Sequence, residues 1–338
     1  MKIYSKKDLN EFHQSLTYDD ISLIPTKVSR IKSRTETSTN CEFLNIKLTL
    51  PVVSSPMDTV SGLEMTKELS RLGCLGILNR FDSSLDELLN HKEENGLVKA
   101  VSIAVNSPLE MIEKLAEKGF VICIDTANAN NSAVLNKSEE IKNKFNIPVI
   151  VGNIAHGATL QQLENAGADA VRVGIGSGSV CTTSVQTGIG IGQVSSLLNV
   201  YFAKQKSKLK IKIIADGGIK HPGDVAKALA LGADVVMAGR MFAGTREAPG
   251  EVIRYQGQLW KKYRGSASFG VKMKNEFIEG EETMVAYKGA VKNVVDNISD
   301  GLKSTMSYMD CFNLDELKNT DTFAVLSNSS YLERLPRI

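Results

Sequence analysis

The sequence lacks the features that mark several classes of protein. No apolar run approaches the roughly 20 residues that cross a bilayer, and the N-terminus has no apolar stretch of a signal peptide. A net charge of +2 over 338 residues gives no electrostatic reason to expect nucleic acid or a membrane as a partner. The five cysteines lie far apart, and no pair has the spacing of metal ligands. We therefore expect a cytoplasmic protein that binds neither nucleic acid nor membrane.

What the sequence does contain is a series of short apolar runs of strand length, with segments of helical spacing between them. Strands that are apolar throughout and alternate with helices indicate a parallel sheet, and eight such units predict an α/β protein with a (β/α)8 TIM barrel. A doubly wound sheet is the alternative, but the usual dinucleotide-binding fingerprint after its first strand is missing. The predicted strands span residues 51–55, 74–78, 100–105, 120–125, 148–152, 168–173, 212–215 and 234–238.

We predict a single barrel domain over residues 1–338. After the eighth strand we expect loops, with a mobile active-site segment at about 263–288, and then a closing helix at 289–309. A partial repeat supports the barrel, since Gly167-Ala-Asp-Ala-Val-Arg-Val-Gly174 matches Gly232-Ala-Asp-Val-Val-Met-Ala-Gly239. Similar strand–helix units placed around one axis produce such a pattern.

Polar residues follow the predicted strands, and in a barrel the carboxyl ends of the strands meet on the face where active sites are built. The most distinctive of them is Cys181, in a loop with glycines on both sides. Because glycine allows positive φ angles and a close approach to a ligand, this loop is typical of a presented, nucleophilic thiol. The alternative is a glycine-rich turn with an incidental cysteine. The other polar residues at strand ends are Ser54, Ser55, Asp58, Asn79, Arg80, Asn106, Asp125, Asn153, Asp216 and Arg240.

A phosphate site is predicted after the seventh and eighth strands, from Asp216-Gly217-Gly218 and Gly239-Arg240. Barrels frequently bind phosphate with backbone N–H groups of these two loops and a helix N-terminus. His221-Pro222 begins the next helix, with proline in its first turn. Asp216 is placed to accept hydrogen bonds from ribose hydroxyls, so a nucleotide monophosphate is the expected ligand. A simple strand-to-helix turn is the alternative.

Several further segments join the Cys181 loop and Ala215-Asp-Gly-Gly218 as distinctive motifs. They are Leu16-Thr-Tyr-Asp-Asp-Ile-Ser-Leu-Ile-Pro25, Pro56-Met57-Asp58-Thr59-Val60, Tyr263-Arg-Gly265 and Glu279-Gly280. In this order the motifs resemble the IMP dehydrogenase/GMP reductase family along nearly the whole chain. The resemblance implies a (β/α)8 barrel that is usually a homotetramer.

The resemblance also implies roles for individual residues. Cys181 would attack C2 of the purine ring and form a covalent thioimidate, and Thr183 and Glu279 would manage protons. The residues expected to bind the GMP or IMP substrate are Met57, Ser179, Asp216, Gly217, Gly218, Gly239, Arg240, Tyr263, Gly265 and Ser266. NADPH would meet Asp125, Ala127 and Arg80, and a potassium ion found in many members would bind the carbonyls of Gly176, Gly178 and Cys181.

Within the family, the chain is most similar to the reductases. Dehydrogenases normally carry a regulatory insert after the early strands, and here Leu78-Asn-Arg-Phe-Asp82 passes directly into the next helix. They also carry an Arg–Tyr pair on a long flap that activates water, and residues 266–278 contain neither arginine nor tyrosine. The sequence therefore favours an NADPH-dependent GMP reductase that releases ammonia.

Several positions depart from the family pattern. Ser177 and Ser184 replace a usual proline and a basic residue, and Asp125-Thr-Ala-Asn-Ala-Asn130 replaces a pattern rich in glycine and histidine. Two alternatives therefore stay open. One is an IMP dehydrogenase without the insert, and the other is a barrel that binds purine nucleotides without chemistry.

Overall fold

Eight parallel strands form the centre of the computed structural model, which describes residues 2–82, 88, 96–265 and 281–334. They pair in the order β4-β11-β10-β9-β8-β7-β6-β5, and a parallel bridge between Val53 and Leu75 joins the two end strands. The predicted (β/α)8 barrel is therefore confirmed. The strands are β4 (Val52–Ser54), β5 (Ile77–Leu78), β6 (Ala100–Ile103), β7 (Val121–Asp125), β8 (Val149–Ile154), β9 (Ala170–Val173), β10 (Lys212–Asp216) and β11 (Val235–Ala238).

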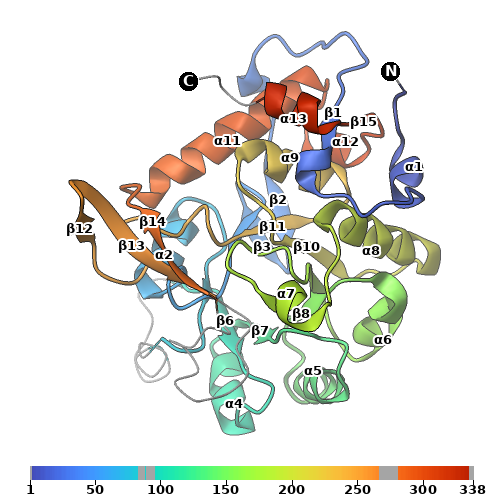
Figure 1. Cartoon of the computed structure of the whole chain (residues 1–338). Coiled ribbons are helices and arrows are strands. Elements are labelled where there is room, and N and C mark those ends of the chain that lie inside the picture. Colours follow the sequence, from blue (N-terminus) through green and yellow to red (C-terminus); the bar gives the residue numbers. More distant parts are fainter. Residues whose placement is uncertain (1, 83–87, 89–95, 266–280, 335–338) are drawn as a thin grey trace.

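Helices alternate with these strands and cover the outside of the barrel (Figure 1). All of those given below except the short α7 bury one face, as Ile112 and Leu115 of α4 show. As predicted, α9 begins at His221-Pro222, with proline in its first turn, and an 18-residue closing helix follows the barrel strands. The helices are α2 (Leu63–Arg71), α4 (Leu109–Glu117), α5 (Ser132–Phe145), α6 (Leu160–Asn165), α7 (Thr183–Thr187), α8 (Gln193–Ser207), α9 (Pro222–Ala230) and α11 (Val291–Tyr308).

The interior of the barrel is filled by side chains, and one end is plugged. The hairpin of β2 (Cys41–Phe43) and β3 (Ile46–Leu48) leads into β4 and packs Phe43 and Leu48 against inward-facing strand residues. Its position at the amino ends of the strands leaves the carboxyl ends accessible.

The segment after β11 differs from the loops that the sequence predicted. It contains an antiparallel sheet of β12 (Ile253–Tyr255), β13 (Gln258–Arg264) and β14 (Glu282–Ala286), with a tight turn at Gln256-Gly257, where both φ angles are positive. Most residues of this sheet are exposed. The sequence of these strands therefore lacks the continuous apolar runs from which the barrel strands were predicted. Residues 266–280 of the predicted mobile segment lie outside the described residues.

The two ends of the chain pack together beside the barrel. Strand β1 (Ile21–Leu23) pairs with β15 (Phe323–Val325), and the short helices α1 (Lys6–Asn10), α12 (Leu314–Lys318) and α13 (Asn328–Glu333) lie near them (Figure 1). None of the described helices combines the length and the apolar character that a membrane span requires.

Candidate active site

A cavity of about 590 Å³ opens at the carboxyl ends of the barrel strands. It is lined from several strand ends, as expected of an active site in this fold. The predicted site residues that line it are Met57, Arg80, Asp125, Ala127, Gly176, Gly178, Cys181, Thr183, Asp216, Gly217, Tyr263 and Gly265.

Cys181 lies in the loop between β9 and α7, at the wall of this cavity. Its backbone N–H donates to the carbonyl of Gly178, and its thiol donates to Thr183 Oγ1 at 3.2 Å. The side chain is half-buried, whereas Cys74, Cys123 and Cys311 are buried. Of the five thiols, Cys181 is thus the one that combines access to the cavity with a neighbouring hydroxyl.

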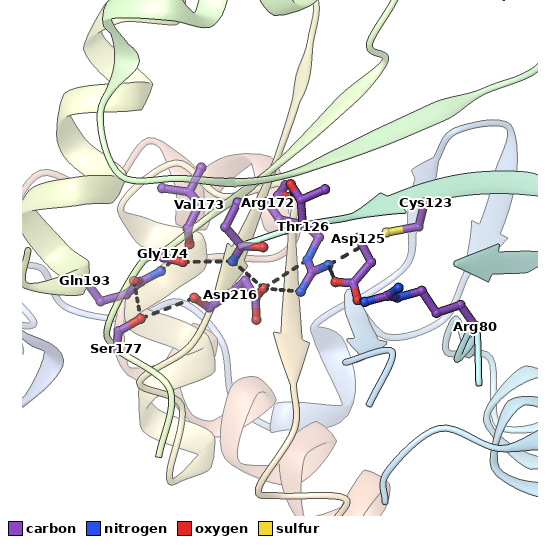
Figure 2. Close-up of polar contacts among 12 residues, drawn as sticks. Arg80, Cys123, Asp125, Thr126, Arg172, Val173, Gly174, Ser177, Gln193 and Asp216 are labelled. Carbon is purple, nitrogen blue, oxygen red and sulfur yellow. Dashed lines mark hydrogen bonds and ion pairs between the residues drawn. The ribbon is translucent and has the colours of Figure 1, made fainter. Parts of the chain in front are cut away.

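The loop is held at its base by Ser177, one of the departures from the family pattern. Ser177 Oγ donates to Gln193 Oε1 at 2.9 Å, and Gln193 Nε2 donates to the carbonyl of Val173 at 2.6 Å (Figure 2). Gly174 has a φ of +144°, and a Cβ there would lie 2.0 Å from the carbonyl oxygen of Asp216. The backbone of the loop therefore requires glycine at this point.

The floor of the cavity is a layer of charged side chains. Successive strand residues point to opposite faces, so inward-facing positions recur at every second residue. Apolar or thiol side chains occupy one inward layer at Cys123, Ile150, Ala170 and Ile214. The next positions toward the carboxyl ends are Asp125, Gly152, Arg172 and Asp216.

Arg172 lines the cavity, although it was not among the site residues that the sequence predicted. Its Nη1 lies 2.5 Å from Asp125 Oδ1, and its Nε and Nη2 lie 3.0 and 2.9 Å from Asp216 Oδ2 (Figure 2). Burial alone would lower the pKa of Arg172, but the two carboxylates outweigh it and raise that pKa, so the guanidinium stays charged. The signal was a single arginine in the apolar run Ala-Val-Arg-Val, at the position where the matching repeat has Met237.

Asp216 presents one carboxylate oxygen to the cavity. Its Oδ2 accepts from Arg172 and from Asn153 Nδ2 at 2.7 Å. Its Oδ1 accepts no hydrogen bond from the residues that the structure describes. This geometry suits a carboxylate that receives hydroxyl donors from a ligand.

Arg80 lies on the opposite side, next to Asp125. Its guanidinium carbon is 4.4 Å from the centre of the Phe81 ring, and its Nε is 3.5 Å from Asp125 Oδ2. That Nε is buried and donates no hydrogen bond within the described part of the chain. A buried donor without an acceptor carries a cost, so this corner of the cavity suits an anionic or oxygen-rich ligand group.

Tyr263 connects the cavity to the predicted phosphate loops. Its hydroxyl lies 3.2 Å from Ser179 Oγ, and burial raises its pKa. A Cβ at Gly239 would lie 3.3 Å from this hydroxyl, so Gly239 is adjacent to it. Lys288, which the sequence analysis also missed, donates to the carbonyls of Arg240 and Met241 and so holds this loop.

Four of the predicted residues do not line the main cavity. Ser179 and Gly239 adjoin it through Tyr263, Gly218 lines a neighbouring pocket of about 420 Å³, and the side chain of Arg240 is exposed. Glu279 and Ser266 lie outside the described residues, so their predicted roles stay predictions.

Comparison with known proteins identifies relatives of the chain. The model of the IMP dehydrogenase / GMP reductase domain matches residues 15–336. The chain is 36% identical over 322 residues to a GMP reductase of Bacillus licheniformis, and 36% identical over 324 residues to one of Staphylococcus aureus. Each match covers 93% of this chain and 97% of the relative. The chain therefore belongs to the IMP dehydrogenase/GMP reductase family.

Proposed function

We propose that the protein is a GMP reductase, which converts GMP to IMP and ammonia with NADPH in purine nucleotide salvage. The observation that carries the proposal is the Cys181 thiol. It is hydrogen-bonded to Thr183 at the wall of a cavity that has Asp216 on one side and Arg80 on the other. The names of the two relatives support the same assignment.

The nucleotide half of the site would bind GMP through its phosphate and ribose. Asp216 Oδ1 would accept from the ribose hydroxyls, since Oδ2 is already taken by Arg172 and Asn153. The phosphate would bind near Ser179 and Tyr263, where Arg240 adds positive charge. The remaining substrate contacts that we propose are with Met57, Gly217, Gly218, Gly239, Gly265 and Ser266.

The reaction would proceed through a covalent adduct at Cys181. The thiolate attacks C2 of the purine and ammonia leaves, which forms the thioimidate. Hydride addition at C2 and departure of the thiolate then give IMP. Two protons are taken up overall as ammonium forms. Thr183, in contact with the thiol, and Glu279 would transfer protons to the departing amine.

The other half of the cavity fits a nicotinamide nucleotide. The buried Arg80 Nε makes no hydrogen bond to the described residues, although Asp125 Oδ2 lies 3.5 Å away, and Asp125 and Ala127 line the cavity beside it. Arg80 would meet the extra phosphate of NADPH, and Asp125 would accept from cofactor hydroxyls. NADPH supplies the hydride when it is bound.

Three further features complete the proposal. Gly176, Gly178 and Cys181 all line the cavity within one loop, and their carbonyls would bind potassium. The five cysteines are all free thiols, which suits a reducing cytoplasm. The homotetramer implied by the family resemblance is part of the same proposal.

The assay mixes the protein with GMP and NADPH in potassium buffer. Loss of reduced-nicotinamide absorbance is followed, and ammonia is measured in the same sample. We expect one ammonia per NADPH consumed, with no consumption when GMP is left out. Turnover of IMP with NAD⁺ to XMP instead would contradict the proposal and identify a dehydrogenase. Nucleotide binding without turnover of either pair would identify a non-catalytic barrel.

A further inference from the structure

We propose that Arg172 is a positioning residue that couples the two halves of the cavity, so that nucleotide and cofactor bind with positive cooperativity. The inference rests on the proposed function for the identity of the two ligands. It is carried by one buried guanidinium that contacts both Asp125 and Asp216.

Arg172, on β9, contacts the adjacent strand on one side and the second strand on the other. Asp125 ends β7 and Asp216 ends β10, and strands β8 and β9 lie between them. In the strand register, Asp125 is opposite Gly152, and Gly152 is opposite Arg172. The guanidinium thus reaches Asp125 by passing over a residue with no side chain.

Gly152 is what leaves this path open. A Cβ at position 152 would lie 2.5 Å from Arg172 Cβ and 2.9 Å from Arg172 Cδ. Non-bonded carbon atoms do not approach this closely, so a larger residue at 152 would displace the Arg172 side chain or the backbone of β8. The Arg172 side chain can therefore follow this path only because the register of β8 places a glycine beside it.

The charges alternate along this path. Arg80, Asp125, Arg172 and Asp216 follow one another, with 3.5 Å between Arg80 Nε and Asp125 Oδ2 and shorter contacts to Arg172. The side chains of Asp125, Arg172 and Asp216 are 9%, 7% and 13% exposed. Interactions between charges are strong where solvent is excluded, so the position of one carboxylate affects the other through the shared guanidinium.

Positive cooperativity follows from this sharing. A ligand that hydrogen-bonds Asp216 restricts the Arg172 guanidinium, which in turn restricts Asp125. The second ligand then binds to a carboxylate whose position the first ligand has already fixed, so the cost of fixing that position is incurred once rather than twice. By thermodynamic linkage, each ligand must tighten the other by the same factor.

The test is calorimetric titration of GMP and of NADP⁺, each alone and with a saturating amount of the other. This pair cannot complete a turnover, because the oxidised cofactor carries no hydride, and ammonia measured after each titration shows whether the Cys181 adduct has formed. We expect each ligand to tighten the other by roughly 5- to 20-fold, within the usual range of allosteric coupling. In Arg172→Met, which introduces the residue found in the matching repeat, the factor should fall to about 1, and both separate affinities should weaken.

Two further variants separate coupling from stability. Gly152→Ala keeps Arg172 but blocks the path of its side chain to Asp125, so this variant should also lose the coupling. If Arg172→Met does not fold, Gly152→Ala provides the test instead. Val171→Ala, at a fully buried position on the same strand, removes packing without touching the charges, and it should keep the coupling. A factor of about 1 in the unmodified protein, or an unchanged factor in both Arg172→Met and Gly152→Ala, would overturn the inference.

Failure of the proposed function gives a different result. A protein that binds GMP and NADP⁺ independently contradicts the coupling and leaves the reductase proposal standing. A protein that oxidises IMP with NAD⁺ contradicts the reductase proposal. In that case the unreactive pair IMP and NADH, measured on the same variants, decides the role of Arg172.

Discussion

The two ends of the barrel each hold a carboxylate among cationic side chains, yet they are built for different purposes. At the carboxyl end, Asp216 uses only Oδ2 for its described protein contacts and faces a cavity. At the amino end, Asp234 uses both oxygens. Its Oδ2 accepts from the N–H of Ile213 at 2.9 Å and lies 3.5 Å from Lys204, and its Oδ1 contacts Lys318 and Lys212. A carboxylate with both oxygens in contact with protein groups holds strands together, whereas one that uses a single oxygen for such contacts can accept hydrogen bonds from a ligand through the other.

The sequence repeat shows how strands with a matching sequence contribute to both ends of the barrel. Asp169 and Asp234 are matching positions, and each accepts a backbone N–H from the preceding barrel strand, Val149 and Ile213. Further along the same strands, Arg172 reaches the cavity while its counterpart Met237 packs in the barrel interior. Similar strands therefore keep a common amino end and diverge at the carboxyl end.

The largest expected difference between the two ends of the barrel is in the effect of replacing a cysteine at each of them. Cys181→Ser should lower kcat by on the order of 10⁴-fold, because a hydroxyl is a far poorer nucleophile, while GMP still binds. Cys74→Ser, a substitution in the buried segment before β5, should leave kcat within about two-fold and lower the free energy of unfolding by about 1–2 kcal/mol. Steady-state kinetics and urea unfolding measure both effects. Undiminished turnover in Cys181→Ser would contradict the covalent mechanism.

The two carboxylates should respond in opposite ways to amide substitution. Asp216→Asn should weaken GMP binding by about 10- to 100-fold, because a charged acceptor for the ribose is lost. Asp234→Asn should leave the Kd for GMP unchanged and destabilise the fold by about 3 kcal/mol, because three lysines lose a buried partner. Calorimetry and urea unfolding measure the two effects. Similar losses of affinity in both variants would remove the distinction between the ends.

Chemical labelling sharpens the comparison at the level of thiols. Burial raises the pKa of Cys41 to about 11 and those of Cys74 and Cys123 to about 12, so little thiolate is present at pH 8. Iodoacetamide should therefore modify Cys181 first, and bound GMP should slow that modification by about ten-fold. Peptide mass spectrometry follows each site. Faster labelling of Cys74 than of Cys181 would contradict the assignment of the reactive thiol.

The smallest expected effect is the acid sensitivity of the amino end. Burial alone would raise the pKa of Asp234, but Lys318 and Lys204 outweigh it and the pKa is lowered. A carboxylate with a lowered pKa contributes stability above its unfolded pKa of about 3.9 and loses that contribution as pH falls through the folded value. The unfolding free energies of the unmodified protein and Asp234→Asn should thus converge below about pH 4. A constant difference from pH 6 to pH 3 would contradict this.

Much of the fold was predictable because it depends on local patterns. The eight barrel strands and the closing helix α11 follow from apolar runs and helical spacing, and Pro222 marks the start of α9. The sheet of β12–β14 was not predicted, since most of its residues are exposed and its strands lack apolar runs.

The sequence by itself determined the barrel, the glycine-rich loop that presents Cys181, and the strand ends that carry Asp125 and Asp216, because these depend on residues close together in the chain. Only the tertiary structure decided which side chains share the cavity. Arg172 lies inside an apolar run, and its contacts with Asp125 and Asp216 span 47 and 44 residues of sequence. They arise from the register across β7, β8, β9 and β10 and from the missing side chain of Gly152. Register is a property of paired strands, so no single segment encodes it.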